Sequence, residues 1–289
     1  MKLAAAAYPL DFLTDWNAYT AKLGAWVATG AATGAELLVF PEYGAMELAS
    51  LGGAKVAADL DAALQEVMRH APRVAALHGV LAAQHSVYIL GASAPARGPA
   101  GHPVNCATLY GPKGVIGHQD KQIMTRFERE EWNIAPGQDG LRVFDTPLGR
   151  IGILICYDAE FPLLGRALAE AGAEILLVPS CTEGLAGYTR VKVGAMARAL
   201  ENQCVVVHAP TVGAADWCPA VDMNTGAAAI YGPPDRGFPD TGILAETALN
   251  APGWAVAEID RATIHAVRRD GAVLNHAHWP EQKMRLGPG

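Results

Sequence analysis

A cysteine in the middle of the chain stands where a thiol could act as a nucleophile. Cys156 follows the apolar run 151–155 in Gly-Arg-Ile-Gly-Ile-Leu-Ile-Cys-Tyr-Asp-Ala-Glu-Phe-Pro, and a turn then leads into a helical run. A thiol between a strand and a helix lies where backbone N–H groups converge, which favours both a thiolate and an oxyanion. The alternative interpretation is a packed core cysteine, because free cysteine is among the most buried residue types.

Two further residues favour the chemical interpretation. Glu42 follows the apolar run 37–40 and Pro41, and Lys121 follows the strand-like runs 108–110 and 115–116. Each alone has an ordinary explanation as a solvated surface residue. Together, a carboxylate, an ammonium group and a thiol at three strand ends are the parts of a site that cleaves amides, because such a site needs a nucleophile, a proton carrier and a positive charge near the oxyanion.

The order glutamate, lysine, cysteine resembles the nitrilase, or carbon-nitrogen hydrolase, superfamily, and the resemblance runs through nearly the whole chain. Phe-Pro-Glu at 40–42 is similar to the family's general-base motif, and Lys121 and Cys156 correspond to its lysine and nucleophile. Asn105 matches an asparagine that precedes a strand and a glycine turn. Two later segments also match, Arg-Ala-Leu-Glu-Asn at 198–202 and Glu-Ile-Asp at 258–260.

The resemblance implies a role for each of the three residues. Glu42 would take the proton of the Cys156 thiol, return it to the departing amine and later activate water against the thioester. Lys121 and a backbone N–H near the nucleophile would hold the oxyanion. A buried Lys121 would also offset the burial of Glu42 and lower the pKa of the thiol.

The resemblance implies further site residues as well. A second family glutamate follows the lysine at a short interval, and we expect it to be Glu128, with Glu130 and Glu131 as alternatives. The mechanism needs no metal, no organic cofactor and none of the nine histidines. Substrate contacts are expected from the residue after the nucleophile and from the loop after strand 175–179, namely from Tyr157, Cys181 and Thr182.

The expected reaction is hydrolysis of a small amide or carbamoyl compound, with release of ammonia or an amine. Nitrilases proper usually place Trp-Glu directly after the cysteine, whereas this chain has Tyr-Asp-Ala-Glu-Phe-Pro, which resembles the amidase branches. A nitrilase acting on a nitrile is the alternative within the superfamily, and acyl transfer to an amine uses the same triad. A catalytically silent binding protein with this fold is the alternative of a different class.

Composition limits the partners. The 289-residue chain has a net charge of −7, which argues against nucleic acid or an anionic membrane as a partner. Five cysteines without paired spacing fit the reducing cytoplasm, and no Cys/His arrangement has zinc-site spacing. No stretch is long and apolar enough to span a bilayer. By resemblance, we expect a homodimer or a higher even oligomer that pairs through helices 163–171 and 189–202.

The elements alternate between strands and helices. Strands are predicted at 2–7, 37–40, 88–91, 107–110, 115–119, 142–145, 151–155, 175–179, 204–210, 227–231 and 255–258. Helices are predicted at 16–33, at 59–84 with a break near Pro72, at 163–171 and at 189–202, and the Gly/Pro-rich stretches 91–104 and 232–242 as surface loops. This pattern indicates an α/β fold with mixed sheets. The resemblance implies a four-layer α-β-β-α sandwich with two mixed β-sheets, formed by residues 1–289 as a single domain.

Overall fold

The computed structural model describes residues 1–98 and 101–287. Its first strand, β1 (Lys2–Pro9), lies near the middle of the strand order. Side chains alternate between the two faces of a strand, so Leu3, Ala5 and Ala7 face one core while Ala4, Ala6 and Tyr8 face another. Both sets are buried. The strand therefore has packed layers on both sides.

The strands form two mixed halves. The first half contains β1, β2 (Leu37–Val39), β3 (Tyr88–Leu90), β4 (Ala94–Arg97), β5 (Pro103–Gly111), β6 (Gly114–Asp120) and β14 (Gly253–Glu258). The second half contains β7 (Val143–Thr146), β8 (Gly149–Ile153), β9 (Ile175–Ser180), β10 (Val205–Ala214), β12 (Ala229–Tyr231) and β13 (Ile243–Glu246). The short β11 (Met223–Asn224) pairs with the end of β10. Parallel pairing of β1 with β10 at Tyr8–Thr211 and Pro9–Val212 joins the halves into one continuous strand path.

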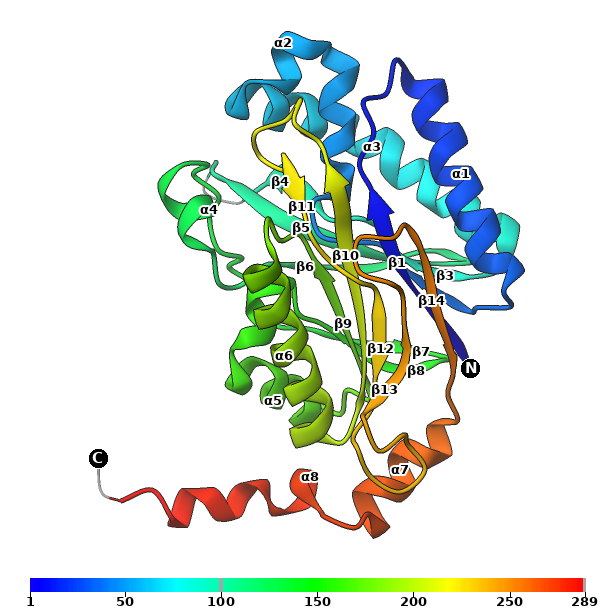
Figure 1. Cartoon of the computed structure of the whole chain (residues 1–289), viewed down its shortest axis with the longest axis vertical. Coiled ribbons are helices and arrows are strands. Elements are labelled where there is room, and N and C mark those ends of the chain that lie inside the picture. Colours follow the sequence, from blue (N-terminus) through cyan, green and yellow to red (C-terminus); the bar gives the residue numbers. More distant parts are fainter. Residues whose placement is uncertain (99–100, 288–289) are drawn as a thin grey trace.

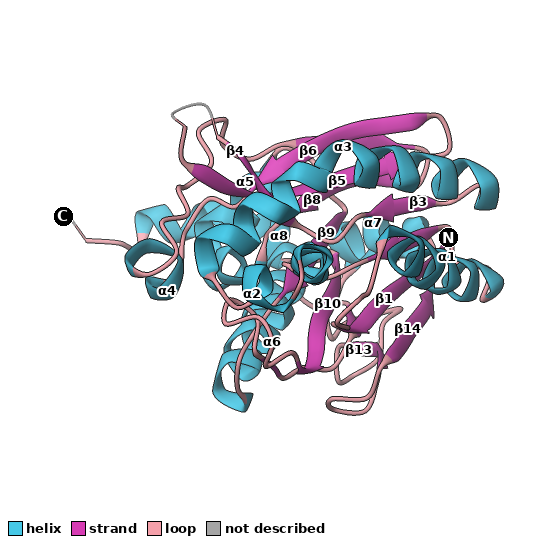
Figure 2. Ribbon diagram, turned by 90° about the horizontal axis from the view of Figure 1, so that it is seen from above, coloured by secondary structure: helices cyan, strands magenta, loops and turns pink. Residues whose placement is uncertain are grey.

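Helices cover the outer faces. The helices α1 (Trp16–Ala32) and α3 (Leu60–His85) contact each other and lie against the first half (Figure 2). The helices α5 (Pro162–Glu170) and α6 (Leu185–Asn202) lie against the second half (Figure 1). The inner core joins Leu3, Leu37 and Leu109 of the first half with Ile153, Leu177 and Val207 of the second. The predicted α/β four-layer architecture is thus confirmed.

Two predictions about local structure are wrong. The helix α3 is continuous through Pro72, because its buried side chains on both sides of the proline, such as Val67 and His78, hold one helix face in place despite the missing N–H. The stretch 91–104 is not entirely a loop, since β4 pairs with β5 there; Pro95 is compatible with this pairing because β4 lies at the edge of the sheet. Part of that stretch, residues 99–100, lies outside the described residues.

The stretch 232–242 is a loop between β12 and β13, as predicted. Several short elements have no counterpart in the sequence prediction: η1 (Gly44–Gly52), α2 (Ala54–Ala57), α4 (Arg126–Glu130), η2 (Cys156–Glu160), α7 (Arg261–Asp270), α8 (Asn275–His278) and η3 (Trp279–Met284), besides β11 and β13. The elements α7, α8 and η3 form a C-terminal arm that extends past the ends of α5 and α6 (Figure 1). Within residues 1–98 and 101–287, no helix is long and apolar enough to cross a membrane.

Candidate active site

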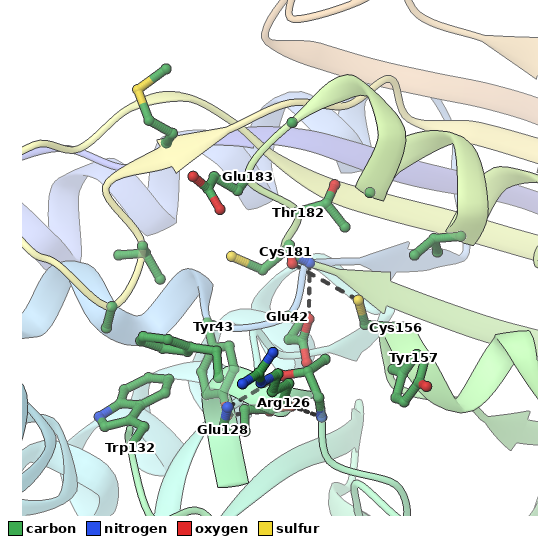
Figure 3. Close-up of a pocket in the computed structure, with 18 of the residues that line it drawn as sticks. Glu42, Tyr43, Arg126, Glu128, Trp132, Cys156, Tyr157, Cys181, Thr182 and Glu183 are labelled. Atoms are coloured by element: carbon green, nitrogen blue, oxygen red, sulfur yellow. Dashed lines mark hydrogen bonds between the residues drawn. The ribbon is translucent and has the colours of Figure 1, made fainter. Parts of the chain in front are cut away.

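The two halves of the molecule bring their strand ends together at one site. Glu42 follows β2 and Lys121 follows β6, both in the first half, whereas Cys156 follows β8 and Cys181 follows β9 in the second. Figure 3 shows the side chains of Glu42 and Cys156 directed at the backbone of Cys181. The three residues predicted from strand ends therefore lie in one cluster.

Glu42 is buried and has a partner on each carboxylate oxygen. Its Oε1 accepts hydrogen bonds from Lys121 Nζ at 2.7 Å and from Asn105 Nδ2 at 2.9 Å. Its Oε2 accepts the backbone N–H of Cys181 at 2.9 Å. The Oγ of Ser93 donates to Asn105 Oδ1 at 2.6 Å and so orients that amide. Burial raises the pKa of Glu42 to about 7, although the neighbouring Lys121 lowers it. A general base that works near neutral pH needs a pKa in this range.

Lys121 joins the two glutamates. Its Nζ also donates to both carboxylate oxygens of Glu128, at 2.9 and 2.7 Å. Burial opposes the charge on Lys121, but the carboxylates of Glu42 and Glu128 outweigh it and hold the pKa of the ammonium group well above its usual value. Burial alone would raise the pKa of Glu128, and Lys121 lowers it below its ordinary value. Lys121 is therefore a fixed positive charge at the bottom of the site.

Local capping explains why Glu128 reaches the site. Thr125 is the N-cap of α4, and Glu128 completes a capping box by accepting the Thr125 backbone N–H at 2.8 Å. The hydroxyl of Tyr43 donates to the other Glu128 oxygen at 2.7 Å. The two alternatives lie elsewhere: Glu130 is exposed and pairs with Arg126, and Glu131 is also exposed. Of the three candidates, the structure places Glu128 against Lys121.

The backbone at Cys156 has an unusual conformation. Its φ is 50°, in the left-handed region that non-glycine residues rarely adopt, at the first residue of η2. The turn is held by the buried carboxylate of Asp158, which accepts the N–H groups of Ile155 at 3.2 Å and of Ile123 at 2.8 Å. The thiol sulfur lies 3.9 Å from the carbonyl oxygen of Cys181. Asp158 therefore fixes the nucleophile turn against the segment that follows Lys121.

The protonation state of Cys156 differs from the expectation. Burial and then the Glu42 carboxylate raise the pKa of the thiol well above its usual value, and the opposing effect of Lys121 is smaller. Lys121 lowers the pKa of the thiol, as predicted, but burial and Glu42 outweigh this effect. Lys121 is paired with the carboxylates of Glu42 and Glu128. Because the pKa of the thiol is raised, the resting sulfur is a neutral thiol. Attack on a carbonyl then requires a base that removes the proton in the same step.

A pocket of about 690 Å³ opens above the cluster. The predicted substrate-contact residues Tyr157, Cys181 and Thr182 all line it. The Thr182 hydroxyl donates to the Thr225 carbonyl at 2.9 Å, and the sulfur of Cys181 points away from that of Cys156 (Figure 3). Further walls come from α4, from the start of α6 and from residues 219–223. Within the described ranges 1–98 and 101–287, no group of three His, Cys, Asp or Glu side chains could hold a metal ion.

Sequence reasoning missed three contributors. Tyr43 and Asp158 stand beside predicted residues, but only the folded chain shows that they bind Glu128 and the nucleophile turn. Asn105 was noted as a family match without a role, and the structure places it against Glu42. The spacing Thr-x-x-Glu at 125–128 is a capping-box signal that distinguishes Glu128 from its two neighbours.

Comparison with known proteins identifies the family of the chain. The profile of the family described as carbon-nitrogen hydrolase matches residues 2–269. A probable hydrolase of Bacillus subtilis, YhcX, is 31% identical over 273 residues, covering 94% of this chain and 52% of that protein. The human deaminated glutathione amidase is 35% identical over 180 residues, covering 60% of this chain and 52% of the relative. The chain thus spans about half the length of these relatives.

Among solved structures, a glutamate-to-glutamine mutant of the amidase from Nesterenkonia sp. AN1 superposes with a TM-score of 0.67 at 22% identity, covering 99% of both chains. This likeness shows that the two proteins share a fold. The family profile extends over nearly all of the sequence and includes every residue of the cluster described above. The chain belongs to the carbon-nitrogen hydrolase family.

Proposed function

We propose that the protein hydrolyses the C–N bond of a small amide through a thioester on Cys156. The observation that carries this proposal is the shared contact with the Cys181 backbone: Glu42 accepts its N–H at 2.9 Å, and the Cys156 sulfur lies 3.9 Å from its carbonyl oxygen. A neutral thiol and a carboxylate with a pKa of about 7 thus lie side by side at the base of a pocket. That is the pairing an activated nucleophile needs.

In the first half-reaction, the Cys156 sulfur attacks the amide carbon while Glu42 takes the thiol proton. The C=O electrons move to oxygen, and the resulting oxyanion is stabilised by Lys121 Nζ and by a backbone N–H of the nucleophile turn. The intermediate then collapses, the C–N bond breaks, and Glu42 gives its proton to the departing amine. The products of this step are a thioester on Cys156 and ammonia or a free amine.

In the second half-reaction, Glu42 removes a proton from water as the water oxygen attacks the thioester. The C–S bond breaks, Cys156 regains its proton from Glu42, and the carboxylic acid leaves. Glu128 acts in both steps as a positioning residue, because it keeps Lys121 charged and fixes its ammonium group beside Glu42. The fixed charge needs no reorganisation when the oxyanion forms.

The relatives support an amide rather than a nitrile. The human relative is named for amidase activity on deaminated glutathione, and in the glutamate-to-glutamine mutant of the Nesterenkonia amidase the active-site cysteine has reacted with acrylamide by Michael addition. A volume of about 690 Å³ is within the range of sites for drug-sized ligands, so the pocket has room for more than the reacting group. Arg126, Arg190 and Glu183 line its walls, which suits substrates with a polar substituent.

We also infer a cytoplasmic homodimer or higher even oligomer in which residues 1–289 form one domain. All five cysteines are free thiols, which fits a reducing compartment. The helices α5 and α6, through which members of the family commonly pair, expose Leu163 (73%), Val193 (61%) and Leu200 (44%). Light scattering at micromolar concentration is expected to give twice the mass of the chain or a higher even multiple of it, and a monomeric mass would contradict this.

Matched amide and nitrile pairs test the reaction. Purified wild-type protein is offered each pair, with and without hydroxylamine, and ammonia, acid and hydroxamate are measured. We expect ammonia and acid from the amides, much slower release from the nitriles, and neither product with Cys156→Ala. Faster release from the nitriles would make the protein a nitrilase, and hydroxamate without acid would make it an acyltransferase. If the wild type turned over no compound in a broad panel, and Cys156→Ala gave the same result, the protein would be a silent binding protein.

A further inference from the structure

The buried carboxylate of Asp158 contacts the two chain segments that carry the lysine and the nucleophile. Its Oδ1 accepts the backbone N–H groups of Gln122 at 3.1 Å and of Ile123 at 2.8 Å, in the segment directly after the lysine. Its Oδ2 accepts the N–H of Ile155 at 3.2 Å, directly before the nucleophile, and shares the N–H of Gln122 at 3.2 Å. Ile123 is thus bound by one oxygen and Ile155 by the other.

The two segments belong to different halves of the molecule. Lys121 follows β6 in the first half, and Cys156 follows β8 in the second. Asp158 therefore connects them through backbone groups, without using either catalytic side chain. In the proposed reaction the sulfur attacks the carbonyl carbon while the ammonium group stabilises the oxygen, so the relative position of the two residues enters the rate directly.

The nucleophile turn also needs support. Cys156 has a φ of 50°, and a non-glycine residue keeps such a conformation only where the surrounding structure holds it. The far end of η2 is held by Arg198, whose guanidinium donates to the Ala159 carbonyl at 3.1 Å. The near end is held by Asp158 through the N–H of Ile155. Loss of the second contact would free the end of the turn that carries the thiol.

We propose that Asp158 is a positioning residue for the hydrolysis, and that its ionised carboxylate holds Lys121 and Cys156 in the arrangement that reacts. This role rests on the proposed function. An ionised carboxylate only accepts hydrogen bonds, whereas a protonated one carries an O–H donor. Protonation also removes the charge that strengthens the bonds to the backbone N–H groups. The two segments are then held less firmly, and a misplacement of about 1 Å costs roughly 100-fold in rate.

The surroundings of Asp158 place its proton uptake below that of Glu42. Burial raises the pKa of Asp158 to about 6, and Lys121 and the backbone N–H groups oppose this rise. The pKa of Glu42 is about 7. The charged side chains of α5 and α6, which pack against η2, pair with other carboxylates: Arg166 with Glu170, Arg190 with Glu160, Lys192 with Glu246 and Arg198 with Glu201. Lys121 is therefore the charged group that acts on Asp158 most directly.

Asp158→Asn tests the proposal with little change of shape. An amide replaces one of the two acceptor oxygens by an N–H donor, so asparagine can hold only one of the two segments. We expect kcat to fall about 10- to 100-fold with KM nearly unchanged. The matched control is Asp235→Asn, because Asp235 also accepts backbone N–H groups from two segments, at Arg236 and Ala272, in the loop between β12 and β13. This control should keep the wild-type kcat.

The pH profile gives a readout that a purely structural role would not change. In the wild type, the plot of log kcat/KM against pH should have a slope of one between pH 7 and pH 6, where Glu42 takes up its proton. The slope should rise towards two between pH 6 and pH 5, where Asp158 takes up the second. In Asp158→Asn it should stay at one. Circular dichroism checks that both proteins remain folded at pH 5.

Alkylation of Cys156 by iodoacetamide gives the same pH comparison without an amide substrate, with Cys156→Ala as the blank. If the wild type hydrolyses no amide, the proposed function fails, and the alkylation profile still decides the role of Asp158. A wild-type slope of one down to pH 5 would overturn the proposal without any variant. Wild-type kcat in Asp158→Asn, a slope that still steepens in this variant, or an equal loss of kcat in Asp235→Asn would also overturn it.

Discussion

Replacement of Lys121 by methionine tests how the buried charges are balanced. Methionine keeps the length of the side chain but removes the ammonium group that contacts Glu42 at 2.7 Å and Glu128 at 2.7 and 2.9 Å. All three residues are buried, so both carboxylates would lose their charge partner without gaining water. Breaking a buried ion pair from one side costs about 3–5 kcal/mol. We expect the melting temperature to fall by about 6–20 °C, since each kcal/mol corresponds to roughly 2–4 °C in a chain of this size.

The pH dependence of this loss identifies its cause. In the wild type the pKa of Glu42 is raised from 4.5 to about 7, so the folded state holds its proton more tightly than the unfolded state. The stability from that proton is present below pH 4.5 and is lost as the pH rises through about 7. Without Lys121 the pKa of Glu42 rises further, and the pKa of Glu128, which Lys121 holds below its ordinary value, rises as well. The deficit of the variant should therefore be small in acid and grow as the pH increases.

Chemical unfolding of wild type and Lys121→Met at pH 5 and pH 8 measures this difference. The matched control is the triple variant Lys121→Met, Glu42→Gln, Glu128→Gln, which keeps a similar side-chain volume and removes the charge at all three positions. It should recover most of the stability at pH 8 while remaining inactive. If Lys121→Met were as stable as the wild type at pH 8, or if its deficit did not depend on pH, the reasoning about the buried charges would be refuted.

Other substitutions probe the roles within the site. Cys156→Ala should abolish turnover while leaving the melting temperature nearly unchanged. Cys181→Ala should keep most activity, because residue 181 contributes backbone groups to the site. Steady-state ammonia release compares the two variants. Glu42→Gln should lower kcat by roughly 10²–10⁴-fold. In the wild type, kcat/KM should fall as the pH drops below about 7, where Glu42 becomes protonated, and a flat profile down to pH 5 would contradict the base assignment. Tyr43→Phe removes one of the donors to Glu128 and should reduce kcat by about tenfold.

Much of the fold could be predicted because the apolar strands are short and sharply bounded. Residues 37–40 and 151–155 end at Pro41 and Cys156, and the structure keeps both strand ends with a shift of one or two residues. The strand-end positions of Glu42 and Cys156 followed from these boundaries. The strand path joins the two halves by pairing β1 with β10, and this long-range pairing leaves no local trace in the sequence.

The features of the fold and the site that were not predicted depend on three-dimensional contacts. The backbone N–H and C=O of Cys181 carry no side-chain signature, although they connect Glu42 and Cys156. The raised pKa of Cys156 arises from burial, which composition and spacing do not encode at a single position. Residues after 260 form short polar helices for which no prediction was made, although α7 is amphipathic and buries Ile264 and Val267. Among the glutamates, only the capping-box spacing at 125–128 could have selected Glu128.

The most direct test of the central claim is to trap the covalent intermediate. The enzyme is mixed with an amide that it hydrolyses. The mixture is quenched in acid within milliseconds and analysed by intact-mass and peptide mass spectrometry. The account predicts a population heavier by the acyl group, located on the peptide that contains Cys156 and absent from Cys156→Ala. An acyl group on Cys181 or on any other residue, or turnover by Cys156→Ala at the wild-type rate, would contradict it.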